Sequence, residues 1–377
     1  MRFLPALALV LLMLGGGCGG PRGAAPTTVP PTSSGAAMTV APSQAITSED
    51  ITFAAGSRTI PGTLVRPIAT TGGPWPAIVL LAGSGPTDRD WRNPALPGTN
   101  GSGKLLAEEL ARRGAVVVRF DKSGSGKNAG PPVAEWTLDT YREEALAAIA
   151  VLSARPDVRA DRVFVAGHSE GGIHATRLAA AAGPQLAGLI FLAATGRTMV
   201  DTILRQIEPQ LRNPIAGLSD EQATAELAAL RTALTDFMAG RPVDPTKVTT
   251  IAPLQQLVAQ LTAPATAGLT RSLLGYDTTA EAPKLALPML VLNGGKDLQV
   301  DAERDGRALA ETLRAAGRDV TFHLAPDADH VLKHEPQTPE ALRAALVSTQ
   351  HAYNAEARTI DPELLRAVAS WLAARTR

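Results

Sequence analysis

Short apolar runs alternate with longer amphipathic segments along most of the chain. The runs are PAIVLLAG, AVVVRFD, RVFVAG, LAGLIFLAA, PMLVLNG and DVTFHLA, and several of them end at a glycine. Continuous apolar runs of this length are typical of strands that are buried on both faces of a parallel sheet. Upstream of them, the segment ITFAAGSRTIPGTLVRP predicts two short β-runs around a turn at residues 55–57.

The segments between the apolar runs have the residue spacing of amphipathic helices. They are GKLLAEELARRG, TLDTYREEALAAIAVLSAR, GGIHATRLAAAAG, ERDGRALAETLRAAG and, at the end of the chain, PELLRAVASWLAAR. Strands that alternate with helices imply right-handed crossovers and a parallel sheet covered on both faces. The predicted fold class is therefore α/β, with a mostly parallel, doubly wound sheet.

One long interval, residues 198–283, interrupts this alternation. It contains helix-like segments such as DEQATAELAALRTALTDFMAG and LQQLVAQL, and no convincing strand pattern. Loops of this length without a function are uncommon. We predict a mostly helical cap at 198–283, inserted between two strands of a core formed by residues 46–197 and 284–377.

The N-terminal stretch MRFLPALALVLLMLGGGCGG has one positive charge, an apolar run from Phe3 to Leu14 and then small residues. The run is too short for an ordinary transmembrane helix and predicts a signal peptide at 1–17. Cys18 follows directly and resembles the lipid-modified first residue of bacterial lipoproteins, although that family prefers leucine where this chain has Gly15. We expect an exported, membrane-anchored protein; a plain secretory signal with an incidental Cys18 is the alternative.

Residues 18–45 are rich in proline, glycine, alanine, serine and threonine, and Arg22 is their only charged residue. Such a segment buries too little apolar surface to offset the entropy of ordering it. We therefore predict a flexible tether at 18–45, between the expected lipid anchor and the folded domain.

The overall composition excludes several protein classes. Of the 377 residues, 45% are hydrophobic and 19% are charged, which indicates a globular chain. Lys plus Arg and Asp plus Glu each number 36, and this balance argues against a nucleic-acid partner. The single cysteine excludes an intramolecular disulfide.

The motif GHSEGG places Ser169 between Gly167 and Gly171, where a predicted strand meets a predicted helix. A sharp turn at such a junction needs small neighbours, exposes the serine hydroxyl and points the following amide toward the same space. Alone the motif is a weak signal, and a purely structural turn is the alternative. The buried strand before it and the alanine-rich helix after it favour Ser169 as a nucleophile.

A serine nucleophile needs a base, and the base needs an acid that orients it. Of the six histidines, His330 lies in a loop just past the carboxyl end of the last predicted strand. Sites in open parallel sheets lie outside that edge. His330 is therefore the preferred base and His334 its rival, whereas His168 belongs to the turn, His174 to a helix and His323 to a strand.

Asp297 lies in the loop after the strand PMLVLNG, at the same predicted edge, and is the preferred acid. An aspartate in a surface turn is the alternative interpretation, and Asp301, Asp327 and Asp329 compete for the role. The chain order of serine, aspartate and histidine is the one found in α/β-hydrolases.

From about residue 50 to its end the chain resembles the α/β-hydrolase family. GHSEGG matches the family's nucleophile elbow, GGKDLQV its acid loop and ADH its histidine loop. LLAGSGPTDRD is similar to the loop after the third strand in bacterial esterases akin to serine-aminopeptidase-like hydrolases, and RFDKSGSGKN resembles the next loop. The resemblance implies an oxyanion hole formed by the backbone amides of Ser84 and Glu170. Many relatives have histidine at the position of Ala82, where this chain departs from the pattern.

Two other motifs resemble ligand-binding sites, but the sequence argues against that role for both. GTNGSGKL at 98–105 fits the first part of a nucleotide-binding P-loop, but Leu105 replaces the Ser or Thr that would bind magnesium, and no strand leads into it. The run Asp88–Asp90 is compatible with a cation but is more typical of ion pairs that fix a loop. No histidine or cysteine cluster indicates zinc, and we expect no cofactor.

Together these patterns predict a serine hydrolase that cleaves a small-molecule carboxylic ester through an acyl-enzyme on Ser169. His330 is the predicted base and Asp297 orients it. Two alternatives remain: a peptidase or acyltransferase with the same residues, and a non-catalytic surface lipoprotein that kept the fold. Contact with a membrane is expected only through Cys18.

Overall fold

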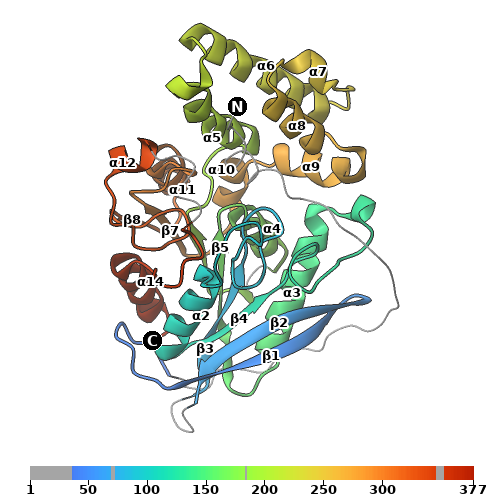
Figure 1. The fold of residues 1–377 in the computed structure, drawn as a ribbon. Coiled ribbons are helices and arrows are strands. Elements are labelled where there is room, and N and C mark those ends of the chain that lie inside the picture. The colour runs from blue at the N-terminus through green and yellow to red at the C-terminus, as the bar shows by residue number, and fades with distance from the viewer. Residues whose placement is uncertain (1–35, 69–72, 183–184, 345–351) are drawn as a thin grey trace.

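The computed structural model describes residues 36–68, 73–182, 185–344 and 352–377. These residues contain one eight-stranded sheet with the strand order β1-β2-β4-β3-β5-β6-β7-β8 (Figure 1). The strands are β1 (Ile46–Ala55), β2 (Arg58–Pro67), β3 (Trp75–Leu81), β4 (Val116–Phe120), β5 (Val158–His168), β6 (Gly188–Leu192), β7 (Met289–Gly294) and β8 (Val320–Ala325). The β1–β2 and β2–β4 pairs are antiparallel, and the pairings from β4 to β8 are parallel. The predicted α/β-hydrolase fold with a mostly parallel sheet is confirmed.

The central strands are buried along their whole length, as their continuous apolar runs predict. Every residue of β3, β4, β6 and β7 is buried. The first two strands form the hairpin expected around residues 55–57, and Gly56 provides the left-handed backbone of its turn with φ 61°.

Helices cover both faces of the sheet. The first apolar cluster packs α3 (Leu138–Ser153), α4 (Gly171–Ala182) and α11 (Ala308–Ala315) on one face. The second packs α2 (Ser102–Arg112) and α14 (Pro362–Arg375) on the other. A π-helical turn, Ala302–Arg307, precedes α11, and a short helix not predicted from the sequence, α12 (Pro339–Ala344), follows β8. The sheet is therefore doubly wound.

Between β6 and β7 the chain forms only helices and loops in its described residues. The helices are α5 (Met199–Leu211), α6 (Asp220–Met238), α7 (Pro245–Val248), α8 (Ala252–Leu261), α9 (Ala267–Leu274) and α10 (Thr278–Glu281), with short 3-10 turns at Pro214–Ala216, Pro264–Thr266 and Ala282–Lys284. Most of them pack on one another around a separate apolar cluster that includes Ile203, Leu230 and Leu257. Figure 1 shows these helices as a second body above the sheet.

Residues 36–45 differ from the prediction of a flexible tether, because they lie against the core. The amides of Thr39, Ser43 and Gln44 donate to the carbonyls of Arg112 and Arg113 at the end of α2. The last carbonyls of a helix lack partners within the helix, so they accept these bonds irrespective of side-chain composition. The side chain of Met38 is buried as well.

The predicted signal peptide at 1–17, Cys18 and the first part of the tether lie outside the described residues. Within the described ranges, every helix is too short or too polar to cross a membrane.

Candidate active site

Ser169 occupies the turn between β5 and α4, with a left-handed φ of 53°. A non-glycine residue in that conformation costs roughly 1–2 kcal/mol, so its surroundings must impose it. A Cβ on Gly167 would lie 2.2 Å from the Gly171 carbonyl oxygen, and a Cβ on Gly171 would lie 2.6 Å from that of Leu81. The alternating glycines are therefore required by close backbone packing around the serine.

His330 and Asp297 form a buried pair at the carboxyl edge of the sheet. The Nδ1 atom of His330 lies 2.9 Å from Oδ2 of Asp297, and the Asp297 side chain is fully buried. Oδ1 of Asp297 accepts bonds from the amides of Gln299 and Val300 at 2.7 and 2.9 Å. These bonds fix the carboxylate and leave Nε2 of the imidazole for other partners.

The environment of His330 shifts its pKa in opposing directions. Burial lowers the pKa of His330, but the carboxylate of Asp297 favours the charged ring, and the net pKa is raised above its ordinary value. His330 and Ser169 line the same pocket, in which Ser84 and Glu170 also lie. The structure therefore gathers the five residues predicted for the site into one region.

His168 supports the loop that carries His330. Its Nε2 donates to the backbone carbonyl of His330 at 2.8 Å, and its ring stacks on Trp91 at 5.0 Å between centroids. Burial, followed by the nearby His330, lowers the pKa of His168 to about 3, so this ring is neutral. His168 is thus a structural neighbour of the site, which the sequence placed only within the turn.

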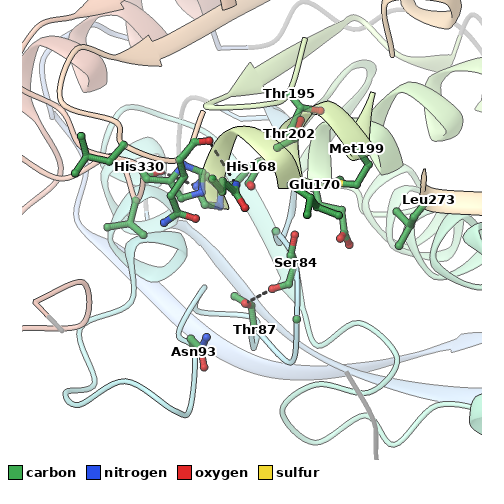
Figure 2. A pocket seen from close by; sticks show the side chains of 18 of the residues that line it. Ser84, Thr87, Asn93, His168, Glu170, Thr195, Met199, Thr202, Leu273 and His330 are labelled. Carbon is green, nitrogen blue, oxygen red and sulfur yellow. Dashed lines mark hydrogen bonds between the residues drawn. The ribbon is translucent and has the colours of Figure 1, made fainter. Parts of the chain in front are cut away.

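Ser84 and Glu170 come from the two chain segments that flank Ser169. Ser84 follows Gly83, and a Cβ on Gly83 would lie 3.1 Å from the Ser169 Cβ. The Ser84 carbonyl accepts a hydrogen bond from Thr87 at 2.6 Å, which Figure 2 shows beneath the two histidines. Glycine at position 83 therefore lets this loop approach the nucleophile turn closely.

The Glu170 side chain is buried in a polar cluster behind the site. His174 donates Nε2–H to its Oε1 at 3.1 Å, and Nζ of Lys122 lies 3.6 Å from the same oxygen. Burial alone raises the pKa of Glu170, but Lys122 and bonds from His174 and Ser84 lower it to about 2. The carboxylate is therefore ionised at neutral pH and engaged on all these partners.

The pocket is a cavity of about 200 Å³ between the core loops and the cap helices. Figure 2 shows Met199 and Leu273 on the side away from His330, with Asn93 and Thr87 near the core loops. Among the described residues of the lining, Glu170 is the one carboxylate, and lysine and arginine do not contribute. Toward the cap, the space above Ser169 is therefore lined by apolar side chains interspersed with threonine and glutamine, and toward the core Glu170 is the one charged group of the described lining.

The rival histidines lie elsewhere. Nδ1 of His334 pairs with Asp361 at 3.2 Å, and 47% of its side chain is exposed. Nε2 of His323 lies 3.5 Å from Glu363 on the face of β8. Neither His334 nor His323 lines the pocket in the described part of the chain.

The rival aspartates have structural partners. Asp301 caps the π-helical turn through the amides of Glu303 and Arg304. Asp327 pairs with Lys296 at 2.8 Å. Asp329 pairs with Arg358 at 2.7 Å and accepts from the amide of Lys333. Asp297 is the aspartate that bonds the His330 ring.

The two motifs that resemble ligand-binding sites, at residues 88–90 and 98–105, have structural roles. In the run Asp88–Asp90, Asp90 pairs with Arg119 at 2.8 Å and Arg89 with Asp121 at 2.7 Å, so ion pairs fix the loop. The segment 98–105 enters α2 from a loop, and the amide of Thr99 donates to Glu356 at 2.9 Å. No group of three or more His, Cys, Asp or Glu able to hold a metal occurs within the described ranges.

Sequence reasoning did not identify Lys122, His168 or Trp91 as parts of the site. Lys122 comes two residues after β4 ends, at the same carboxyl edge as the predicted site residues. Its position and the family-like segment RFDKSGSGKN that contains it are the sequence signals for it, whereas its partners come from distant segments of the chain.

A family model described as serine aminopeptidase, S33, matches residues 100–337. Esterase EstD of Thermotoga maritima is 26% identical to this chain over 274 residues, a match that covers 72% of this chain and 58% of the relative. The chain thus spans less than two thirds of that relative's length.

Solved structures with a similar trace include brefeldin A esterase, titled a bacterial homologue of human hormone-sensitive lipase. It is 20% identical, with a TM-score of 0.49, 90% of this chain covered and 79% of that chain. Proline iminopeptidase of Mycobacterium smegmatis is 17% identical, with a TM-score of 0.47, 81% of this chain covered and 99% of that chain.

Proposed function

The chain belongs to the serine aminopeptidase S33 family of α/β-hydrolases, and we propose that it is a serine hydrolase that cleaves carboxylic esters. One observation carries the proposal: the imidazole of His330, bonded to the buried Asp297, lines the same pocket as the strained Ser169. The geometry agrees with an acyl-transfer site in which nucleophile, base and orienting acid come from separate loops.

In the proposed reaction, Asp297 accepts the Nδ1–H of His330, so that Nε2 is free to act as the base. Nε2 removes the Ser169 proton while Oγ attacks the ester carbonyl carbon. The amides of Ser84 and Glu170 donate to the oxygen that becomes negative. The carbon–oxygen bond to the alcohol then breaks, and the protonated His330 gives its proton to the departing alcohol.

The second half of the reaction frees the enzyme. A water molecule attacks the acyl group on Ser169 and gives its proton to His330. The tetrahedral intermediate collapses, the acid leaves, and the proton returns from His330 to the serine oxygen. These steps use only this chain's residues, the ester and water.

The pocket lining favours an ester over the amino-terminal peptide bond that the family description names. An aminopeptidase must bind the protonated amine of its substrate, and a carboxylate is the usual partner for such a charge. The described lining offers only Glu170, whose carboxylate is already engaged by Lys122 and His174. The name of the relative EstD also supports an esterase.

A matched pair of substrates tests this proposal. We expect the purified protein to hydrolyse p-nitrophenyl butyrate far faster than the p-nitroanilide of the same acid, and faster than alanine p-nitroanilide. The Ser169→Ala variant is the control for uncatalysed and contaminant hydrolysis. Faster cleavage of the amino-acid anilide would identify a peptidase instead, and equal rates for wild type and Ser169→Ala would remove the serine mechanism.

We further propose that the protein is exported and anchored through a lipid on Cys18. A single acyl chain binds membranes only marginally, whereas two or more hold firmly, and lipoprotein processing would add several chains to one cysteine. Cys18→Ser is expected to move the protein from the membrane fraction and the detergent phase to the aqueous phase while ester hydrolysis per molecule is unchanged. Wild-type protein found wholly in the aqueous phase would contradict the anchor.

A further inference from the structure

A buried polar cluster behind Ser169 has no part in the proton transfers described above. It consists of Lys122, Tyr141, Glu170 and His174, which come from the loop after β4, from α3, from the nucleophile turn and from α4. The side chains of Lys122 and Glu170 are 7% and 4% exposed. Taking such charges out of water is costly unless they are well paired, so their retention at this place calls for a reason.

Lys122 connects the two chain segments that flank the nucleophile. Its Nζ donates to the backbone carbonyl oxygen of Gly83 and lies 3.6 Å from Oε1 of Glu170. The ring of Tyr141 covers the ammonium at 5.5 Å from its centroid. One cation therefore joins the loop after β3 to the turn after β5.

The bond to Gly83 acts on a particular peptide unit. The carbonyl of Gly83 and the amide of Ser84 belong to the same planar trans peptide, in which the C=O and the N–H point in opposite directions. A cation that holds the carbonyl oxygen therefore also sets the direction of the Ser84 N–H. Hydrogen bonds in series polarise one another, so the ammonium also makes this N–H a stronger donor.

Glycine at position 83 makes such a restraint necessary. Glycine lacks the Cβ that limits backbone rotation, and a Cβ here would press on Ser169 at 3.1 Å. The close approach thus requires a residue whose peptide is otherwise free to rotate. Lys122 supplies the orientation that a side chain at position 83 would have supplied.

The charges in the cluster are consistent with this role. Glu170 is ionised, because Lys122, His174 and Ser84 hold its pKa at about 2 despite burial. Burial lowers the pKa of His174, so this ring is the neutral donor on Glu170. Burial also lowers the pKa of Lys122, while the neighbouring Glu170 carboxylate favours its charged form.

We propose that Lys122 is a positioning residue that orients and polarises the Ser84 amide through the Gly83 carbonyl, and so sets one half of the oxyanion hole. The inference rests on the proposed ester hydrolysis. It also follows that Glu170 has two separate roles, since its own amide is the second donor and its carboxylate holds the lysine.

The kinetic signature follows from when the oxyanion exists. The ester carbonyl becomes negative only on the way to the transition state, so a misdirected donor lowers kcat and leaves ground-state binding unchanged. Removing one donor of an oxyanion hole costs on the order of 10²–10³ in kcat. A donor that is present but poorly aimed should cost less, about 10- to 100-fold.

The test compares Lys122→Met with Arg159→Met. Arg159 is a matched control: it is buried, donates to the carbonyl of Thr376 at 2.7 Å and lies 3.5 Å from Asp161, but it sits at the start of β5, at the opposite end from Ser169. Rates on p-nitrophenyl butyrate are divided by the concentration of sites titrated with a phosphonate, so that misfolded protein does not count. Thermal denaturation is followed for each variant.

We expect Lys122→Met to lower kcat per titrated site at least tenfold with KM within twofold, and Arg159→Met to lower Tm without changing kcat. Because Lys122→Met leaves the buried Glu170 carboxylate without its cation, Lys122→Met with Glu170→Gln is measured as well and should show the same loss of kcat. If the wild type hydrolyses the ester and both Lys122 variants keep its kcat, this inference is overturned and the proposed function stands. A wild type that hydrolyses no ester overturns the proposed function and this inference with it.

Discussion

Two histidines four positions apart in the same loop, His330 and His334, each pair with an aspartate in nearly identical local geometry. Nδ1 of His330 lies 2.9 Å from Oδ2 of Asp297, and Nδ1 of His334 lies 3.2 Å from Oδ2 of Asp361. In each pair the other carboxylate oxygen accepts the amides two and three positions later, at 2.7 to 3.0 Å. Local hydrogen bonding therefore does not distinguish the two histidines.

The difference lies in what surrounds them. The side chain of His330 is 6% exposed and lines the pocket with Ser169, whereas that of His334 is 47% exposed and lies outside it. Asp361 is the N-cap of α14, so its bonds stabilise a helix end. Asp297 occupies a loop after β7 and holds a ring that faces the cavity. The same motif thus serves structure in one place and is available for catalysis in the other.

The largest effect should separate the two histidines themselves. His330→Ala and Ser169→Ala should each remove nearly all ester hydrolysis, because the residues act as a unit and losses reach about 10⁶-fold in kcat. His334→Ala should keep kcat within about twofold. Steady-state rates on one ester decide this, and a greater loss in His334→Ala would exchange the roles of the pairs.

The aspartates should differ next. Asp297→Asn keeps the shape of the side chain but favours the wrong tautomer of the ring, and should cost roughly 10⁴-fold in kcat. Asp361→Asn should leave kcat unchanged, and it should also keep the helix cap, because asparagine caps about as well as aspartate. If both variants lost activity equally, the pairs would share the catalytic work.

The pH dependence should report His330 alone. Burial lowers the pKa of His330, but the Asp297 carboxylate raises it by more than burial lowers it, so the net pKa lies above 6.5. The base works only when neutral, so kcat/KM should fall as pH drops through a midpoint above 6.5, roughly tenfold per pH unit. His334→Ala should leave this midpoint in place, and Asp297→Asn should lower it. If kcat/KM stayed unchanged between pH 8 and pH 5, a histidine base would be excluded.

The smallest effect should appear in stability. Asp361→Ala removes the cap of α14 and should lower the free energy of unfolding by about 1 kcal/mol, with kcat per active molecule unchanged. Urea denaturation monitored by circular dichroism measures the change. A fall in kcat without loss of stability would indicate that the His334 pair acts on the site rather than on the helix.

The sequence predicts the sheet and the site loops because both follow from local pattern. Continuous apolar runs mark β3, β4, β6 and β7. Each predicted catalytic residue follows the carboxyl end of a strand: Ser169 follows β5, Asp297 follows β7 and His330 follows β8. Strand ends at one edge of a parallel sheet converge whatever the intervening chain does. Asp297 and His330 are therefore identifiable although 33 positions separate them.

Other features depend on contacts that leave no local pattern. Lys122 bonds the carbonyl of Gly83, 39 positions away, and any residue offers a carbonyl. Residues 36–45 attach to the end of α2 through backbone amides, which every residue except proline carries, so side-chain composition does not reveal the attachment. The sequence favours His330 over His334 only by its position in the loop. The difference in burial supports the same choice, but burial arises only in the folded chain.

A fluorophosphonate probe tests the central claim, that Ser169 is a nucleophile activated by His330, most directly. The probe reacts with activated serines, and peptide mapping by mass spectrometry locates the adduct. The account predicts an adduct on Ser169 in the wild type, an equal labelling rate in His334→Ala, labelling slower by several orders of magnitude in His330→Ala, and none in Ser169→Ala. An adduct on another residue, or fast labelling of Ser169 without His330, would contradict it.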